Sequence, residues 1–208
     1  MASGLRAPIR AVVFDYGAVI CRLPSPAEWA EFADAADLSI DAFIRSYPFT
    51  REEYDRGRIR AAEYWRSFAA VNGRHYDAAA IRRLSEIDIR VWSHIDDAVV
   101  EFARALQTSG VKTGILSNMQ PDFLDVLRHE QPDWLAAFDA SVFSCDVGFV
   151  KPERQIYEHL IDKLAVPSRE VLFVDDVAMN VDGAKNAGMQ AAVFTSIDDV
   201  RQLLDSTV

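Results

Sequence analysis

The second half of the sequence alternates between short apolar runs and longer segments with helical periodicity, and this alternation constrains the fold most. Four runs are typical of buried strands, at residues 111–116, 140–143, 171–174 and 191–194. Helical segments are expected before, between and after them, at residues 97–108, 121–129, 153–164, 177–187 and 197–204. Strands that alternate with helices form a parallel sheet with helices on both faces.

A fifth apolar run, residues 10–14, lies near the start of the chain and is rich in β-branched side chains. It is typical of a strand that is buried on both faces of a parallel sheet. Asp15 follows it directly, and open α/β sheets bind their ligands just beyond the carboxyl ends of such strands. Gly17 has no side chain, so we expect the backbone to turn tightly there and approach a ligand. The alternative is that Asp15 merely caps a loop.

Residues 23–93 hold no strand candidate, and their pattern is helical throughout. Ser39 is expected to cap one of these helices, and Thr50 with Glu53 has the spacing of a capping box for the next. Gly57 should break that helix, and residues 61–71 and 77–90 should form two more. We therefore predict an α/β fold, a doubly wound parallel sheet formed by residues 1–21 and 95–208, with a helical cap of residues 22–94 inserted after the first strand.

The chain of 208 residues carries a formal net charge of −10, which limits its partners. Such a field repels nucleic acid and anionic membranes, so we expect neither as a partner. No apolar stretch approaches the length needed to span a bilayer. The two cysteines, Cys21 and Cys145, have no metal-ligand spacing and suit a reducing compartment. Because Asp15 also interrupts the first apolar run, we expect a cytoplasmic protein rather than an exported one.

Four polar groups are expected at the same edge of the sheet, because all strands of a parallel sheet end there. Asp15, Ser117 and the pair Asp175 and Asp176 each follow a predicted strand, and Lys151 precedes a predicted helix. Each has an ordinary alternative: a turn hydroxyl for Ser117, a solvated side chain for Lys151 and a helix cap for the aspartate pair. Their joint occurrence favours a catalytic site.

The order of these groups resembles the four motifs of the haloacid dehalogenase-like (HAD) superfamily, and the resemblance covers nearly the whole chain. The matching residues are Phe14-Asp15-x-Gly17, Leu116-Ser117-Asn118, Lys151-Pro152-Glu153 and Val174-Asp175-Asp176-x-x-x-Asn180. The helical insertion is similar to the cap of that superfamily. The third and fourth motifs are similar to the branch that contains the phosphatase domain of epoxide hydrolases and bacterial sugar-phosphate phosphatases.

The resemblance implies a Mg²⁺-dependent phosphatase in which Asp15 is the nucleophile and forms an aspartyl-phosphate that water hydrolyses. Mg²⁺ would be held by Asp15, the carbonyl of Gly17 and Asp176. Asp175 would orient Lys151 or a metal-bound water, although the two aspartates could exchange these roles.

The substrate implied by the resemblance is a small phosphorylated molecule. Lys151 and Ser117, with amides near Asn118, would hold its phosphoryl oxygens. In the cap, Arg58 could contact the far end of the substrate, although pairing with a neighbouring glutamate is the simpler role for it. The chain could act as a monomer or a homodimer.

Gly17 departs from the pattern of most phosphatases of this superfamily, which carry a second aspartate there as general acid and base. General acid–base catalysis is typically worth ~10²–10⁴-fold. The substrate could therefore have a good leaving group, or a cap residue such as Glu53, Arg58 or His94 could supply the proton. A third possibility is a non-catalytic binding protein with a degenerate site.

A metal-independent 2-haloacid dehalogenase is the alternative enzyme, because it would use the same attack by Asp15. The pair Asp175 and Asp176 argues against it, since three carboxylates repel a carboxylate substrate unless a divalent cation neutralises them.

Overall fold

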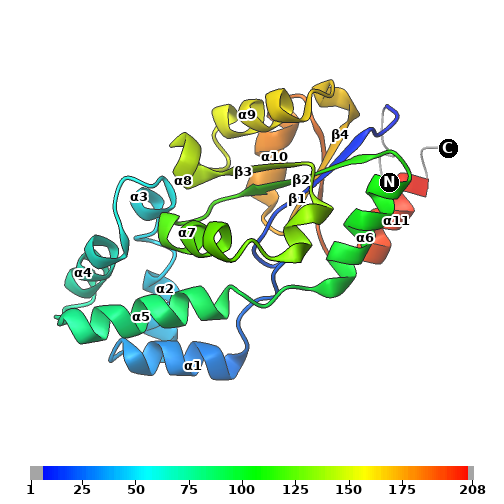
Figure 1. Cartoon of the computed structure of the whole chain (residues 1–208). Helices are drawn as coiled ribbons and strands as arrows, with labels where there is room; N and C mark the ends of the chain where they lie inside the picture. The colour runs from blue at the N-terminus through cyan, green and yellow to red at the C-terminus, as the bar shows by residue number, and fades with distance from the viewer. Residues whose placement is uncertain (1–6, 206–208) are drawn as a thin grey trace.

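The computed structural model describes residues 7–205, so residues 1–6 and 206–208 of the predicted core lie outside the described residues. Its centre is a five-stranded sheet with the strand order β3-β2-β1-β4-β5, and all four strand pairings are parallel (Figure 1). The strands are β1 (Ala11–Phe14), β2 (Lys112–Ser117), β3 (Ala140–Phe143), β4 (Val171–Asp175) and β5 (Gln190–Val193). The predicted doubly wound α/β fold is confirmed.

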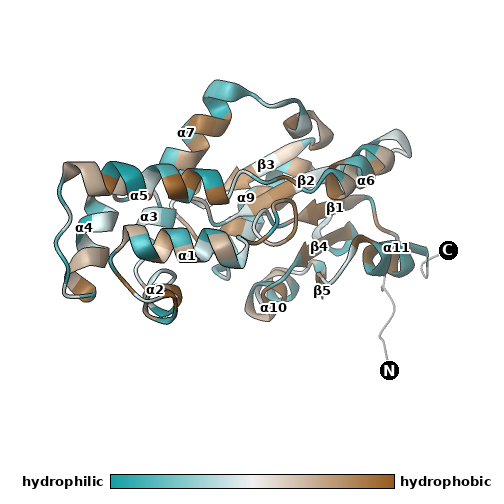
Figure 2. Cartoon of the chain, turned by 90° about the horizontal axis from the view of Figure 1, so that it is seen from below, coloured by the Kyte–Doolittle hydropathy of each residue, from teal (hydrophilic) through white to brown (hydrophobic). Residues whose placement is uncertain are grey.

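Helices cover both faces of the sheet, as two separate hydrophobic clusters show. Val12 and Phe14 of β1 pack with α6 (Asp97–Thr108), α7 (Pro121–Glu130) and α11 (Ile197–Asp205). Ala11 and Val13 point to the opposite face and pack with α9 (Arg154–Leu164) and α10 (Ala178–Asn186). Figure 2 shows the sheet as a mainly hydrophobic layer between these helices. The sequence patterns did not predict the short helix α8 (Ser144–Val147) or the 3-10 turns η1 (Asp133–Ala137) and η2 (Ser168–Glu170).

Five helices lie together beyond the carboxyl end of β1, at the lower left of Figure 1. These cap helices are α1 (Pro26–Ala35), α2 (Ile40–Ser46), α3 (Glu52–Asp55), α4 (Ala61–Val71) and α5 (Ala78–Val91). They enclose a hydrophobic cluster of their own, which is rich in aromatic side chains such as Phe32, Phe43 and Trp65. The exact limits of the cap, residues 22 and 94, stay a prediction.

The helix caps show where local sequence signals act and where one fails. The side chains of Ser39 and Asp77 accept hydrogen bonds from backbone N–H groups at the starts of α2 and α5. The predicted capping box at Thr50 is wrong, because its hydroxyl donates to the carbonyl of Ser46 instead. Helix α3 then begins one residue later than expected, with Arg51 at its N-cap and no side-chain cap.

The two segments that connect the cap helices to the core run side by side as a neck. The Arg22 amide donates to the carbonyl of His94 over 3.0 Å, and the Asp96 amide donates to that of Ile20 over 2.8 Å. Cys21 lies in an antiparallel bridge between these two bonds. The chain therefore leaves the core and returns to it at the same place.

Cys21 and Cys145 are both free thiols. Among the residues described, none of the helices has the length and apolar character that crossing a membrane requires.

Candidate active site

Asp15 directly follows the central strand β1, which has β2 on one side and β4 on the other. Its amide donates to the carbonyl of Val174 over 2.9 Å, which fixes the backbone at this edge. One carboxylate oxygen accepts from the amide of Tyr16 at 2.6 Å and lies 2.6 Å from Nζ of Lys151. Burial raises the pKa of Asp15, and the Lys151 ammonium opposes this effect.

Lys151 is almost fully buried and bridges two carboxylates. Its Nζ lies 2.6 Å from Asp15 and 2.7 Å from Asp175. Burial alone would lower the pKa of Lys151, but the two adjacent negative charges outweigh burial and raise it. The side-chain amide of Asn118 fixes the backbone of Lys151, because its Oδ1 accepts from the Lys151 amide at 2.8 Å and its Nδ2 donates to the Lys151 carbonyl at 3.2 Å. Asn118 thereby ties the loop after β2 to the loop before α9.

Asp175 at the end of β4 is completely buried, and its oxygens have several donors. It accepts from Lys151 at 2.7 Å, from the amide of Val177 at 2.8 Å and from Nδ2 of Asn180 at 3.0 and 3.1 Å. These hydrogen bonds hold the Asp175 carboxyl group beside Lys151. Asp175 thus contacts Lys151 directly, and its orienting role stays a prediction.

Asp15, Asp175 and Asp176 each offer a carboxylate oxygen, and these three oxygens lie within 4.8 Å of one another. Asp176 is exposed to solvent, but the surrounding protein removes part of the water around its carboxylate, and this desolvation and the charge of Asp175 both raise its pKa. Carboxylate oxygens are the ligands that Mg²⁺ prefers, and a divalent cation would offset the repulsion within the group. The residues present therefore fit such an ion.

The backbone after Asp15 turns differently from the prediction. Gly17 does not adopt a left-handed conformation, whereas Ala18 does, with φ of 59°. A Cβ added to Gly17 would meet a ring carbon of Trp92 at 3.5 Å, which is ordinary van der Waals contact. The turn therefore does not require glycine at position 17. The absence of a side chain there affects which functional groups the site contains, not the conformation of the backbone.

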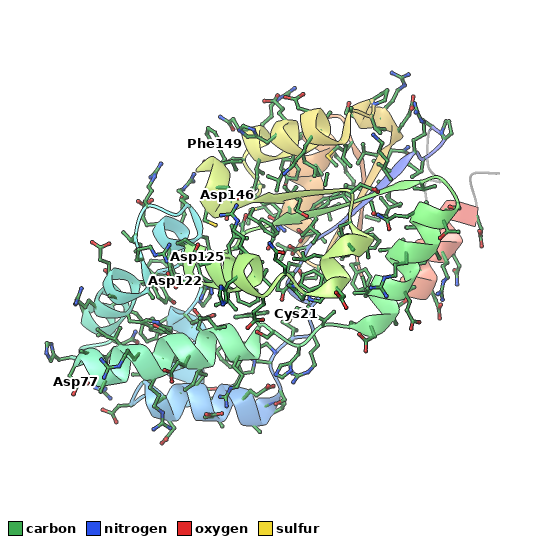
Figure 3. The ribbon with its side chains drawn as sticks, in the orientation of Figure 1. Cys21, Asp77, Asp122, Asp125, Asp146 and Phe149 are labelled. Carbon is green, nitrogen blue, oxygen red and sulfur yellow. The ribbon has the colours of Figure 1, made fainter. Side chains whose placement is uncertain are left out.

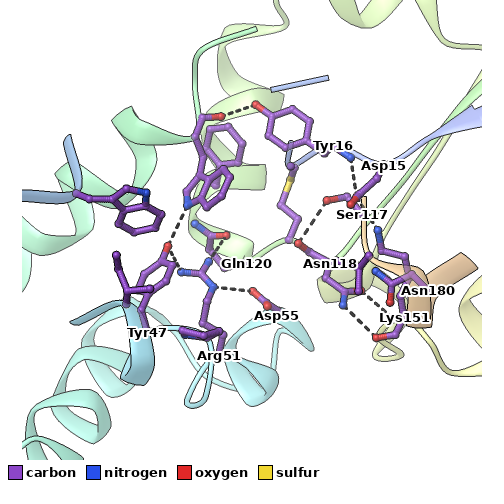
Figure 4. A pocket seen from close by; sticks show the side chains of 18 residues that line it. Asp15, Tyr16, Tyr47, Arg51, Asp55, Ser117, Asn118, Gln120, Lys151 and Asn180 are labelled. Carbon is purple, nitrogen blue, oxygen red and sulfur yellow. Dashed lines mark hydrogen bonds and ion pairs between the residues drawn. The ribbon is translucent and has the colours of Figure 1, made fainter. Parts of the chain in front are cut away.

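A cavity of about 440 Å³ lies between the sheet edge and the cap helices (Figure 4). The core supplies the polar residues Asp15, Ser117, Asn118, Gln120, Lys151 and Asn180, and the cap supplies Arg51 and Asp55. The rest of the lining is largely apolar or aromatic and comes from both parts of the chain: Tyr16, Trp29, Ile44, Tyr47, Pro48, Trp92, Met119, Phe123 and Val177. The cavity thus combines a charged end with a larger apolar chamber.

Arg51 is the cap arginine that lines this cavity, and the sequence analysis missed it. Its guanidinium lies 3.1 Å from Asp88 and donates to Gln120 at 2.7 Å and to the Tyr47 hydroxyl at 2.5 Å. The Tyr47 hydroxyl in turn donates to Asp88. The signal that could have revealed this network was Asp88 at a buried helical position of α5 among Ile81, Leu84 and Ile87, which demands a cationic partner.

Among the described residues, the structure does not bring Arg58 to the cavity. Its side chain is 59% exposed and lies 2.9 Å from Glu53, so it takes the simpler paired role. The two other suggested proton donors, Glu53 and His94, do not line the cavity either, and His94 lies 2.7 Å from Glu28. The nearby Arg60 pairs with α7, where Figure 3 labels its partners Asp122 and Asp125.

The sequence of residues 9–188 matches the family model of haloacid dehalogenase-like hydrolases. Because this match spans most of the chain, the protein belongs to that family and is a hydrolase.

Two relatives are informative about its branch. Bifunctional epoxide hydrolase 2 of Rattus norvegicus is 35% identical over 98 residues, which are 46% of this chain and 18% of that protein. The chain therefore corresponds to a small part of this relative. The sesquiterpene phosphatase astK of Aspergillus oryzae is 27% identical over 86% of this chain and 87% of its own.

Solved structures share the fold at low identity. A HAD family enzyme of Bacteroides thetaiotaomicron in a magnesium complex has a TM-score of 0.76 and 16% identity, covering 95% of this chain and 98% of its own. An L-2-haloacid dehalogenase has a TM-score of 0.74 and 20% identity, covering 96% of this chain and 100% of its own. At these identities the likeness concerns the fold alone.

Proposed function

We propose that this hydrolase is a Mg²⁺-dependent phosphatase that acts on phosphate monoesters through an aspartyl-phosphate on Asp15. The observation that carries the proposal is the buried Lys151, which lies within 2.7 Å of both Asp15 and Asp175 beside the three-carboxylate group. A cation and a divalent-ion site around one acceptor carboxylate suit phosphoryl transfer, which depends mainly on positioning and charge neutralisation.

Asp15, Asp176 and the carbonyl of Gly17 would hold the Mg²⁺, with Asp175 as the adjoining carboxylate. The bound ion would neutralise charge on the phosphoryl oxygens and on the carboxylates that face them. The chain's own groups do the rest: the carboxylate of Asp15 attacks phosphorus, Lys151 balances the charge on the transferred group, and the Ser117 hydroxyl donates to one of its oxygens. Asp175 and Asn118 keep Lys151 in place through the bonds described above.

The organic part of the substrate would occupy the apolar chamber. Aromatic side chains such as Trp29, Tyr47 and Trp92 line it, so a hydrophobic group gains more there than a polyhydroxylated sugar. The match to a protein named as a sesquiterpene phosphatase supports the same choice. The proposed substrate class is thus a phosphomonoester of an apolar or aromatic alcohol.

The test is phosphate release from benzyl and 4-nitrophenyl phosphate by the purified protein with Mg²⁺ and with EDTA. We expect turnover that EDTA abolishes and that Asp15→Asn lowers by on the order of 10³-fold or more, because the nucleophile is lost. Turnover that survives in Asp15→Asn would contradict the proposal. So would chloride release from 2-chloropropionate in the presence of EDTA, which would indicate a dehalogenase.

A further inference from the structure

The proposed phosphatase lacks the aspartate that usually protonates the leaving group, because Gly17 stands at that position. An alkoxide is a poor leaving group, so an ester of an aliphatic alcohol needs a proton donor beside its bridging oxygen. This donor must lie in the cavity, and it must reach the phosphoryl group from the side opposite Asp15. The inference below rests on the proposed phosphatase activity.

Asp55 is the one carboxyl group besides Asp15 among the described residues that line the cavity, and neither histidine nor cysteine lines it. It is the last residue of α3, on the cap side of the cavity. Figure 4 draws its side chain between Arg51 of the cap and Asn118 of the core. Asp55, Asn118 and Lys151 also line a second, neighbouring cavity, so Asp55 lies at the junction of the two.

One oxygen of the Asp55 carboxyl faces Arg51 but accepts no hydrogen bond. Its Oδ1 is buried and has no hydrogen-bond partner, and its closest cation is Nε of Arg51 at 3.4 Å. Arg51 itself already binds Asp88, Tyr47 and Gln120, so it does not depend on Asp55 for its position. A buried carboxyl oxygen that has a long ion pair but accepts no hydrogen bond is costly to keep, which favours a functional reason for it.

The backbone around Asp55 is fixed to the core. The Ser144 hydroxyl donates to the carbonyl of Asp55, and Arg56 donates to the carbonyl of Gly148 at 3.1 Å and to Glu153 at 2.7 Å. Gly57 approaches α8 so closely that an added Cβ would lie 2.5 Å from the carbonyl oxygen of Cys145. These contacts fix the backbone at Asp55 against the core.

The surroundings of Asp55 give it a suitable acidity. Burial raises its pKa from an ordinary aspartate value to about 6, against the opposing charge of Arg51. The other charged groups that act on it are Asp88, which raises the pKa further, and Lys151, which lowers it. The titratable side chains of Tyr64 and Cys145 also lie near it. A carboxyl group of this acidity can both donate and accept a proton close to neutral pH.

We propose that Asp55 is the general acid and base that replaces the aspartate missing at position 17. As the Asp15 carboxylate oxygen forms its bond to phosphorus, the bond from phosphorus to the ester oxygen breaks, and that oxygen takes the proton of Asp55. The Asp55 carboxylate then takes a proton from water, whose oxygen attacks phosphorus while the bond to Asp15 breaks. Alcohol and phosphate are released, and both aspartates return to their initial state.

The experiment compares Asp55→Asn with the wild type on benzyl and 4-nitrophenyl phosphate, which have similar rings but differ in the stability of the leaving oxyanion. We expect kcat/KM for benzyl phosphate to fall by ~10²–10⁴-fold, the usual contribution of a general acid. The value for 4-nitrophenyl phosphate should fall by less than about tenfold, because nitrophenolate leaves without a proton. Glu53→Gln is the matched control, since it makes the same change on the same helix at an exposed residue, and it should alter neither value.

Two outcomes would overturn the inference. One is an equal loss on both esters in an Asp55→Asn protein whose circular dichroism and melting temperature match the wild type, since that would indicate a positioning role. The other is a ratio of wild-type kcat/KM for benzyl phosphate to that for 4-nitrophenyl phosphate that does not fall as pH rises; both esters share the ionisation of Asp15, and this measurement needs no variant. If the wild type hydrolyses neither ester, the proposed function itself fails, which is a different result.

Discussion

At the scale of single residues, the site predicted from the sequence depended on side chains that directly follow strands. Asp15, Ser117 and Asp175 could be placed together because parallel strands end at one edge, and Lys151 joined them because it precedes a predicted helix. Arg51 and Asp55 could not be found in this way, because they lie on a short cap helix whose approach to the sheet depends on tertiary contacts. Arg58 attracted attention because it stands next to a loop glycine, yet it points to Glu53.

Gly17 offers a direct test of how the proton is supplied. The backbone there accepts a side chain, because position 17 is not left-handed and an added Cβ makes only ordinary contact with Trp92. We expect Gly17→Asp alone to change kcat/KM for benzyl phosphate by less than about tenfold. Added to Asp55→Asn, the same change should raise kcat/KM at least tenfold, since general acid catalysis is worth ~10²–10⁴-fold. Kinetics of the two single variants and the double variant measure this. Independent, additive effects of the two changes would contradict it.

At the scale of elements, the periodic segments were predicted well and the short ones poorly. Helices α4 and α5 and strand β3 have clear apolar periodicity, and the structure places them within one residue of the predicted limits. Helix α8 has four residues, too few to show a helical period, and the position of α3 depends on Thr50, which bonds to the preceding turn. The local sequence does not determine where such short helices begin and end, because tertiary contacts determine which of the competing hydrogen bonds forms.

The Arg51–Asp88 pair joins α3 to α5 inside the cap, and its loss should destabilise the fold. Asp88 is 1% exposed, so Arg51→Leu leaves an uncompensated buried charge and should lower the free energy of unfolding by about 3–5 kcal/mol. Urea denaturation measures this. The double variant Arg51→Leu with Asp88→Leu should lose less than Arg51→Leu alone, because both charges are gone. Arg58→Leu, which removes an exposed pair, is the control and should change little.

At the scale of the whole molecule, catalysis in the proposed reaction requires the cap helices and the core to be in contact, because each contributes groups to one cavity. Their contact is polar and specific: Arg56 reaches Glu153, Arg60 reaches α7, and Gly57 touches α8. Figure 3 shows Asp122, Asp125 and Asp146 of the core on the side of the molecule that faces α3. The sequence indicated a cap and suggested that Arg58 could reach the substrate, but it did not show which cap residues meet the core.

Gly57→Ala should weaken this contact. The added methyl would lie 2.5 Å from the carbonyl oxygen of Cys145, and φ of 73° disfavours alanine by about 1–2 kcal/mol. Gly73→Ala is the matched control, since φ is 63° but nothing lies within 4 Å of the added atom. We expect Gly57→Ala to lower the melting temperature and kcat/KM for benzyl phosphate clearly more than Gly73→Ala does. Equal effects of the two variants would contradict a tight contact at Gly57.

The neck formed by Arg22 with His94 and Ile20 with Asp96 has a consequence for protein engineering. The chain leaves the core and returns to it at adjacent points, so the cap is an insertion whose two ends lie side by side. A foreign helical module whose ends lie equally close can be grafted there without altering how the five strands are connected. Substrate preference would then be exchangeable separately from the reacting carboxylates and lysine.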